Sequence, residues 1–421
     1  MSSRALAPFR FRDFRLRWFG AFVSNVGTWM ETVALGYYVA DLTGRNTWSA
    51  LVAVAGFAPI AVLGPVGGVW ADRLPKKHVM MAVALSQAAI AAVLAYGVAD
   101  GWAGPGVITL LALLTGVANA VGFPAFQASV PELVPEEQLV AATSLFAVQW
   151  NLGRIIGPLA AAIAIAVGGI ELALYVNAVS FFAVVVAVWL GPRHPPERRA
   201  AQKVLASIKE GFRVGFTEPG LRTMFLAQIL IVGITSPFIA FVPQMAKNVL
   251  GGDEVANSIM ITGQGVGAVA AGVAMGSLTH RFGPRRVLTT AMAMLCPAYV
   301  LYGLAPSVAA STAALVLMGA LYLTCFASFT AIVQTRAPAA LRGRLLAVSN
   351  TILGVLYPLS SIVQGAIADQ VGLRQVTVAA GLVVGGTLAA AAVLRPDWSA
   401  PLDEEPVPWL EAEGLGAPAR H

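Results

Sequence analysis

The chain has 421 residues, of which 57% are hydrophobic and only 11% are charged, whereas a soluble globular protein carries roughly 25% charged residues. With a mean hydropathy of +0.75, the 27 basic and 21 acidic side chains cannot cover a water-facing surface of this size, which excludes an ordinary soluble enzyme and a disordered chain. The net charge of +6 does not indicate nucleic-acid binding, because the basic residues lie in short clusters between long apolar segments.

Apolar segments follow one another along the whole chain. A helix that spans a bilayer needs about 20 mainly apolar residues. Segments that are free of charged residues, or interrupted by one, cover 18–40, 46–71, 78–99, 101–131, 138–170, 172–192, 223–246, 255–280, the two parts of 287–335, 345–368 and 375–394. Membrane-barrel strands are about ten residues long and alternate in polarity, so these continuous segments favour helices. The sequence predicts an all-α, polytopic membrane protein with twelve transmembrane helices.

The basic residues indicate how these helices are oriented. Cytoplasmic loops of membrane proteins carry an excess of Lys and Arg. Twelve helices put both termini on one side, and 23 of the 27 basic residues then fall on that side. Three fall on the opposite side (Arg45, Lys247 and Arg374), and Arg154 lies inside the membrane. We therefore expect both termini to be cytoplasmic, and we expect contact with lipids rather than with nucleic acid.

A polar segment divides the predicted helices into two groups of six. Residues 192–220 contain prolines and several basic residues, and we interpret them as a cytoplasmic linker. Within the linker, apolar side chains at near-helical spacing over 203–216 predict an amphipathic helix at the membrane surface, with a simple tether as the alternative. The other parts are an N-terminal six-helix half (1–191), a C-terminal six-helix half (221–395) and an acidic cytoplasmic tail (396–421).

The two halves share a motif after their second helix. The first copy contains Gly68, Asp72, Arg73, Lys76 and Lys77. A degenerate second copy begins at Gly276, half a chain later, and has His280 at the Asp position. Duplicated six-helix halves are typical of transporters that work by alternating access, with the cargo site near the midplane of the membrane.

At this motif the sequence resembles the major facilitator superfamily, whose loop between helices 2 and 3 carries a Gly, an Asp-Arg pair and two basic residues. The segment 153–158, Gly-Arg-Ile-Ile-Gly-Pro, is similar to the Gly-Pro signature associated with antiporters of this superfamily. Segments 24–30 and 131–137 resemble the bacterial exporters that include the enterobactin exporter and macrolide efflux proteins. The resemblance covers roughly residues 8–395. It implies a monomeric transporter of the bacterial cytoplasmic (inner) membrane, driven by a proton gradient and without a bound cofactor.

Two charged residues lie deep inside predicted spans. Glu31 is about 14 residues into the first span and Arg154 about 13 residues into the fifth, or roughly 20 Å at 1.5 Å per residue. Charges at that depth are costly and indicate function. We expect Glu31 to carry the coupling proton. Because the resemblance makes helices 1 and 5 neighbours, we also expect Glu31 to pair with Arg154 in at least one state. The alternatives are a structural carboxylate and an Arg154 that binds backbone carbonyls beside Pro158.

The motif after helix 2 has an implied gating role. The resemblance makes Asp72 a cap for the positive N-terminus of helix 11, near Gly343, which would latch the two halves together. Lys76 and Lys77 would bind lipid headgroups or acidic side chains. The distribution of basic residues between the two sides of the membrane is the alternative reason for these two lysines.

Small residues recur at four-residue spacing in helices 5 and 8. They include Gly153, Gly157, Gly263 and Gly267, and Pro158 directly follows Gly157 in helix 5. Small residues at this spacing let membrane helices approach closely, and the resembled fold brings these two helices together across the halves. Ordinary close packing is the alternative.

The resembled fold lines its cargo cavity with helices 1, 4, 7 and 10. Near the midplane these helices offer Asn25, Thr28, Asn119, Phe123, Gln228, Thr235, Tyr322 and Phe326. A mainly apolar pocket with few polar groups suits an amphiphilic or aromatic cargo. Each of these residues is alternatively a packing residue.

We therefore expect a secondary transporter, not an enzyme, that exports a small amphiphilic or aromatic molecule (a drug, siderophore or secondary metabolite) in exchange for protons. The sequence has no Gly-Lys-Ser/Thr loop for ATP and no intramembrane cluster of metal ligands. The alternatives are uptake or lysolipid flipping on the same fold, and a membrane scaffold that transports nothing.

Overall fold

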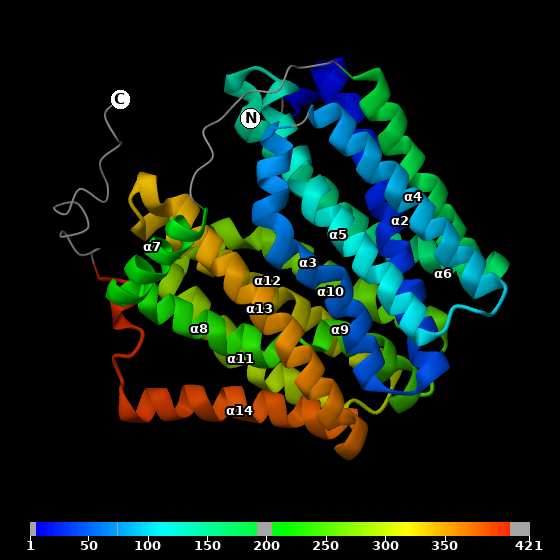
Figure 1. Ribbon diagram of the computed structural model, residues 1–421. Coiled ribbons are helices and arrows are strands. Elements are labelled where there is room, and N and C mark those ends of the chain that lie inside the picture. Colours follow the sequence, from blue (N-terminus) through cyan, green and yellow to red (C-terminus); the bar gives the residue numbers. More distant parts are fainter. Residues whose placement is uncertain (1–5, 74, 192–203, 405–421) are drawn as a thin grey trace. The chain divides into compact units, whose positions relative to one another are not determined.

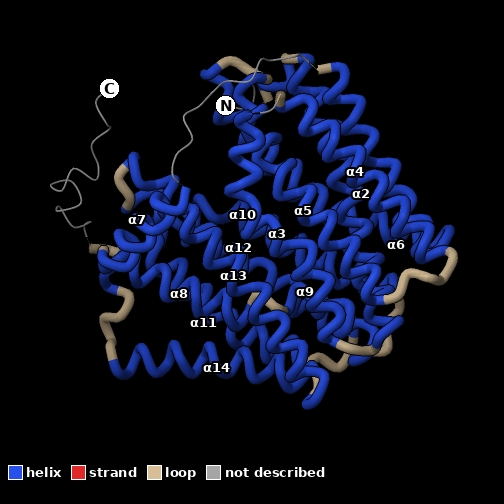
Figure 2. The backbone as a smooth tube through the Cα atoms, in the orientation of Figure 1, coloured by secondary structure: helices blue, strands red, loops and turns tan. Residues whose placement is uncertain are grey.

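The computed structural model describes residues 6–73, 75–191 and 204–404, and these residues form helices and loops with no strand (Figures 1 and 2). The start of the predicted linker (192–203) and most of the predicted tail (405–421) lie outside the described residues. The contacts divide the chain into two compact units. Residues up to 201 form the first unit together with Ala240–Thr262, and Gln202–Ile239 with the residues from Gly263 onwards form the second.

The first unit is built from five long helices. They are α2 (Arg12–Thr43), α3 (Asn46–Arg73), α4 (Lys76–Ala99), α5 (Pro105–Ser129) and α6 (Leu139–Leu190). Short 3-10 turns lie at Ala7–Arg10 (η1), Val130–Glu132 (η2) and Glu136–Gln138 (η3). The helix α6 is too long for one span, and it is interrupted at Gly168 and Gly169. Gly169 has a φ of +75°, which a residue with a side chain rarely adopts, so α6 comprises two spans.

The second unit contains the amphipathic segment and five of the membrane helices. Its helices are α7 (Val204–Thr217), α8 (Pro219–Thr235), α11 (Pro284–Leu304), α12 (Val308–Arg336), α13 (Ala339–Val371) and α14 (Leu373–Leu394). A last 3-10 turn, η5, covers Ala400–Leu402. Two further helices, α9 (Phe238–Gln244) and α10 (Glu254–Phe282), have residues in both units, and the π-helical η4 (Met245–Val249) belongs to the first.

The helices account for the twelve predicted spans. Within the described residues, nine helices are long and apolar enough to cross a membrane, with α6 counted once and α8, α9 and η4 counted together. Dividing α6 at Gly169 and adding α2 and α3 gives a number consistent with twelve. The prediction of an all-helical polytopic membrane protein is therefore confirmed.

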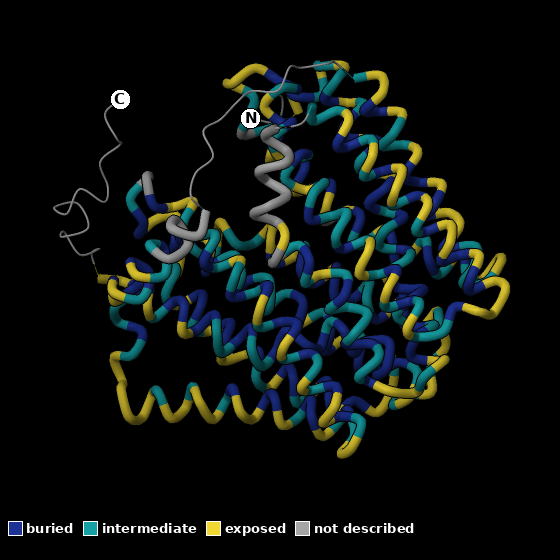
Figure 3. Tube along the Cα trace, in the orientation of Figure 1, coloured by how far each residue is buried: buried dark blue, intermediate teal, exposed yellow. Residues whose placement is uncertain are grey.

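The apolar side chains divide between buried clusters and exposed helix surfaces. In the first unit, Met30, Val33 and Leu174 belong to a buried apolar cluster that joins α2 to the second span of α6. Large apolar side chains also remain exposed, among them Val167, Val273 and Val393, each about four-fifths exposed. Exposed positions recur along the helices (yellow in Figure 3). Exposed apolar surface on this scale is expected where the neighbour is lipid.

The amphipathic segment packs on its own unit. Gly211 of α7 lies against the Arg344 carbonyl of α13, where an added Cβ would be 3.0 Å from that oxygen. The rings of Phe212 and Phe216 are stacked with centroids 6.0 Å apart, and Phe216 stacks in turn on Phe225 of α8 at 5.7 Å. The described apolar side chains of α7 therefore cover the ends of α8 and α13.

Candidate functional site

Glu31 of α2 faces the second span of α6. The Asn177 amide donates a hydrogen bond to the Glu31 carboxylate, with Nδ2 and Oε2 2.5 Å apart. One turn before Glu31, Gly27 leaves room for this contact, because a Cβ there would lie 2.7 Å from Asn177 Oδ1. Ser180 in turn donates to the Asn177 carbonyl at 2.7 Å. The predicted proton carrier is thus held by a polar group between two membrane helices.

Arg154 lies in the first span of α6 and faces an aromatic ring of α2. Its Cζ atom is 5.7 Å from the centroid of the Trp29 ring, a cation–π distance that stabilises a desolvated guanidinium. Glu31 accepts from Asn177, and Arg154 has contacts besides Trp29. The Glu31–Arg154 pair stays a prediction.

The predicted interface glycines make room for neighbouring helices. On α6, a side chain at Gly153 would overlap the Asn25 amide and a side chain at Gly157 would overlap the Trp29 Cβ. On α10, a Cβ at Gly263 would lie 2.7 Å from the Thr312 methyl group of α12. Gly267 lies against the Val316 backbone, and Pro158 lies within the α6 helix. These contacts are close packing within each unit.

The two lysines of the predicted gating motif make specific contacts. Lys76 forms an ion pair with Glu132, with Nζ and Oε1 2.5 Å apart, and also donates to the Ala128 carbonyl at 3.1 Å. Lys77 donates to the carbonyls of Trp189 and Gly191 at 2.7 and 2.9 Å, so it caps the negative end of α6. Gly68, Asp72 and Arg73 belong to α3, but their side chains lie outside the described residues.

The helix is interrupted between α8 and α9, in the middle of the seventh predicted span, and we call this interruption the break. Ser236 and Pro237 form a turn between the two helices, and side chains from other helices donate to the carbonyls beside it. The Gln364 amide donates to the Ile234 carbonyl at 2.9 Å, and the Tyr299 hydroxyl donates to the Thr235 carbonyl. Discontinuous membrane helices mark cargo sites in many transporters.

Aromatic rings gather at this break. The ring centroids of Phe238 and Tyr299 are 5.8 Å apart, those of Phe238 and Tyr322 5.6 Å, and those of Tyr322 and Phe326 4.7 Å. Ser236 Oγ and the Tyr322 hydroxyl are hydrogen bonded at 2.5 Å. Phe238 and Tyr299 are buried, whereas Tyr322 and Phe326 are half-buried. This aromatic cluster (Phe238, Tyr299, Tyr322 and Phe326) presents two accessible rings and a hydroxyl from α12.

The other predicted cavity residues lie in varied surroundings. Asn25 is buried and donates to the carbonyls of Gln149 and Trp150, both at 3.2 Å. Gln228 is buried and exchanges hydrogen bonds with Ser349. The hydroxyls of Thr28 and Thr235 donate to carbonyls one turn earlier in their own helices. Asn119 accepts from Gln87 at 2.8 Å, and the Phe123 side chain is half exposed. The Asn25 and Gln228 side chains therefore join helices, whereas the Thr28 and Thr235 hydroxyls bond within their own helices.

The end of α2 contacts residues that follow the predicted linker. Lys247 of η4 pairs with Asp41, with Nζ and Oδ1 2.7 Å apart, and lies 5.4 Å from the centroid of the Tyr37 ring. Gln244 donates to the Arg45 carbonyl and to Ser49 Oγ, both at 3.0 Å. Nearby, Asn248 donates to the Gly44 carbonyl at 3.2 Å. We call this group the α2–η4 junction, and all of it belongs to the first unit.

Comparison with known proteins identifies the family. The model of the family described as "Transmembrane secretion effector" matches residues 3–412. The chain belongs to the transmembrane secretion effector family. The chain is 27% identical over 382 residues to the multidrug efflux pump Tap of Mycolicibacterium fortuitum, covering 86% of this chain and 91% of that one. It is 23% identical over 376 residues to macrolide efflux protein A of Streptococcus pyogenes, covering 87% and 92%.

A solved structure confirms the fold. The nucleoside transporter NupG superposes with a TM-score of 0.70 over 90% of this chain and 99% of that chain, at 16% sequence identity. This likeness shows the fold alone. Together with the family match, it confirms the resemblance to the major facilitator superfamily and establishes a multi-pass membrane transporter for small molecules rather than an enzyme.

Several residues that contact Glu31 or the break between α8 and α9 were not among the predicted site residues. Asn177 carries an amide in an otherwise apolar span, and the pair Ser236-Pro237 interrupts the apolar segment 223–246. Both signals are visible in the sequence, because polar amides and prolines inside membrane helices need local compensation. Gln364 carries the same signal, because it is an amide inside the predicted span 345–368. Tyr299 carries none, since its role depends on the helix that it faces.

Proposed function

We propose that this protein exports small amphiphilic or aromatic drugs in exchange for protons, with Glu31 as the proton carrier. The observation that carries the proposal is the Glu31 carboxylate between two membrane helices, hydrogen bonded to Asn177. A carboxylate in such a place is costly when charged and neutral when protonated. Binding and release of one proton would therefore change the charge that α2 carries through the membrane.

The nature of the cargo is inferred from the relatives and from the aromatic cluster. The relatives are named as a multidrug efflux pump and a macrolide efflux protein, and these names favour export over uptake. Tyr322 and Phe326 offer half-buried rings beside the break between α8 and α9. Aromatic faces with a single hydroxyl suit a mainly apolar molecule that has one or two polar groups.

Replacement of Glu31 tests the proton carrier. In membrane vesicles with an imposed pH gradient, Glu31→Gln is expected to lower gradient-driven transport of erythromycin and ethidium at least tenfold. Exchange of labelled for unlabelled erythromycin without a gradient is expected to persist, because the glutamine keeps the volume and a hydrogen-bonding group. Asp100→Asn, which alters an exposed loop acid, is the matched control. Normal gradient-driven export by Glu31→Gln would rule out the role.

The setting of the protein is also part of the proposal. We place a monomer without a bound cofactor in the bacterial inner membrane, as in the resembled exporters. Both termini are placed in the cytoplasm, because 23 of the 27 basic residues fall on the side of the termini. Fusion of green fluorescent protein to the C-terminus is expected to fluoresce, whereas fusion of alkaline phosphatase is expected to be inactive. The reverse result would overturn the orientation.

A further inference from the structure

A buried ion pair joins the beginning of α8 to the end of α12. Glu218 directly precedes α8, and its carboxylate accepts a hydrogen bond from the Leu221 N–H. Arg336 is the last residue of α12, and its guanidinium donates to both Glu218 oxygens through Nη2 and Nε. The two side chains are 0% and 7% exposed. A buried pair of this kind is stable only when its remaining donors also find acceptors.

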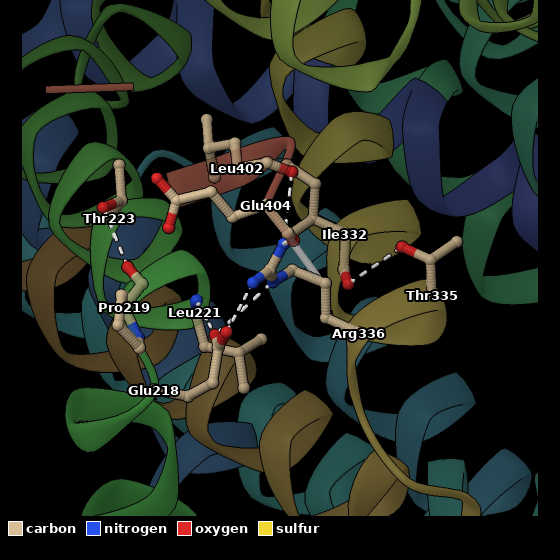
Figure 4. Close-up of polar contacts among 9 residues, drawn as sticks. All are labelled: Glu218, Pro219, Leu221, Thr223, Ile332, Thr335, Arg336, Leu402 and Glu404. Carbon is tan, nitrogen blue, oxygen red and sulfur yellow. Dashed lines mark hydrogen bonds and ion pairs between the residues drawn. The ribbon is translucent and has the colours of Figure 1, made fainter. Parts of the chain in front are cut away.

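Those acceptors come from a segment beyond the last membrane helix. Figure 4 shows the Arg336 guanidinium between Glu218 and the carbonyls of Leu402 and Glu404, with Nη1 3.3 and 2.6 Å from the two carbonyl oxygens. The Leu402 side chain is itself buried. Gly220 completes the arrangement, because a Cβ at that position would overlap the guanidinium.

A second arginine holds the same segment. Arg285, at the beginning of α11, donates to Ser399 Oγ at 2.9 Å and pairs with Asp403 at 3.3 Å. The backbone of the segment is also ordered by its own bonds, from Leu402 N–H to the Ser399 carbonyl and from Asp403 N–H to the Ala400 carbonyl. We call Ser399–Glu404 the strap, and we call the strap with Glu218 and Arg336 the clasp.

The strap determines whether the ion pair stays buried. Without it, Nη1 of Arg336 loses both carbonyl acceptors, and we expect water to take their place. An ion pair in contact with water contributes far less to holding two helices together than a buried and fully hydrogen-bonded one. The strength of the α8–α12 connection therefore depends on the strap.

The two connected helices also carry the aromatic cluster. Thr235 ends α8 at the break, and Tyr322 and Phe326 lie on α12. We infer that the strap contributes to transport. By keeping the Glu218–Arg336 pair buried, it holds α8 and α12 together, so that the two helices beside the aromatic cluster move as one body. The transport part of this inference rests on the proposed export function, whereas the docking of the strap does not.

Hydrogen exchange measured by mass spectrometry tests the docking in the full chain, reconstituted in lipid nanodiscs. In the unaltered protein, the amides of the strap are expected to exchange at least tenfold more slowly than those of a free peptide with the same sequence. Gly220→Ala and Arg336→Gln should remove this protection. Gly386→Ala is the matched control, because a Cβ at this exposed position of α14 meets nothing within 4 Å. Leu402→Asp displaces the strap without altering α8 or α12, and it replaces Gly220→Ala if that variant does not fold.

Export of erythromycin from cells, normalised to the amount of protein in the membrane, tests the consequence. Gly220→Ala and Leu402→Asp are each expected to lower export at least fivefold, with Gly386→Ala unchanged. The inference is overturned if the strap of the unaltered protein exchanges like the free peptide, or if the displaced strap leaves export unchanged. If the unaltered protein exports neither erythromycin nor ethidium, the proposed function fails, and the exchange rates alone decide whether the strap docks.

Discussion

The clasp and the α2–η4 junction both use an ion pair to join helices that are far apart in the sequence, but their surroundings differ. Glu218 and Arg336 are 0% and 7% exposed and share further acceptors from the strap. Asp41 and Lys247 are 53% and 36% exposed. The Lys76–Glu132 pair lies between these extremes, with side chains 16% and 21% exposed.

The difference shows that a short distance between opposite charges does not by itself measure the strength of a connection. An exposed pair is screened by water and salt, and it gains little over the hydration that it replaces. A buried pair costs much to desolvate, but removing one partner leaves the other charge buried without compensation. We therefore expect the clasp to be a fixed connection and the α2–η4 junction to be one that opens readily.

The largest effect is expected at the clasp. Arg336→Gln should lower the free energy of unfolding by about 3–5 kcal/mol, because it leaves the Glu218 carboxylate buried without its cation. Glu218→Gln should cost less, because Arg336 keeps the carbonyls of Leu402 and Glu404 as acceptors and can still donate to the glutamine oxygen. Unfolding curves of the purified variants in the same detergent measure both values. Equal losses, or a loss below about 1 kcal/mol for Arg336→Gln, would contradict the asymmetry.

A smaller effect is expected at the beginning of α4, in the first unit. Lys76→Ala should lower the free energy of unfolding by about 1–2 kcal/mol, because it removes a half-buried ion pair with Glu132 and a bond to the Ala128 carbonyl. Lys77→Ala is a useful comparison at the next position of α4, since it removes bonds only to the carbonyls at the end of α6. Its loss is expected to be about half as large. A larger loss for Lys77→Ala would reverse the ranking.

The smallest effect is expected at the α2–η4 junction. Asp41→Asn should shift the midpoint of thermal unfolding by less than about 2 °C at low salt, and this difference should vanish in 0.5 M NaCl because salt screens exposed charges. The effect of Arg336→Gln should persist under the same conditions. Thermal unfolding curves at the two salt concentrations measure these shifts. A persistent effect of Asp41→Asn would show that the junction is stronger than its exposure indicates.

Much of the architecture was predictable because the membrane imposes it. The length of each apolar segment predicted the spans, and the division of α6 at Gly169 lies within two residues of the charged Glu171 at which the sequence ended one predicted segment and began the next. The depth of Glu31 within its span was likewise predictable from counting residues along a helix. Its contact with Asn177, 146 residues later, was not. Contacts of this kind depend on how each helix is rotated about its axis.

The sequence by itself determined the class of protein, the positions of the spans and the presence of two intramembrane charges, because a bilayer accepts only long apolar segments whose backbone groups are satisfied internally. Only the tertiary structure decided which groups face one another. It placed Asn177 beside Glu31, gathered the aromatic cluster at the break between α8 and α9, and brought the strap to Arg336. Nothing in the local sequence of Arg336 distinguishes it from other basic residues at the ends of helices. Its role follows from burial, which α8, α12 and the strap create together.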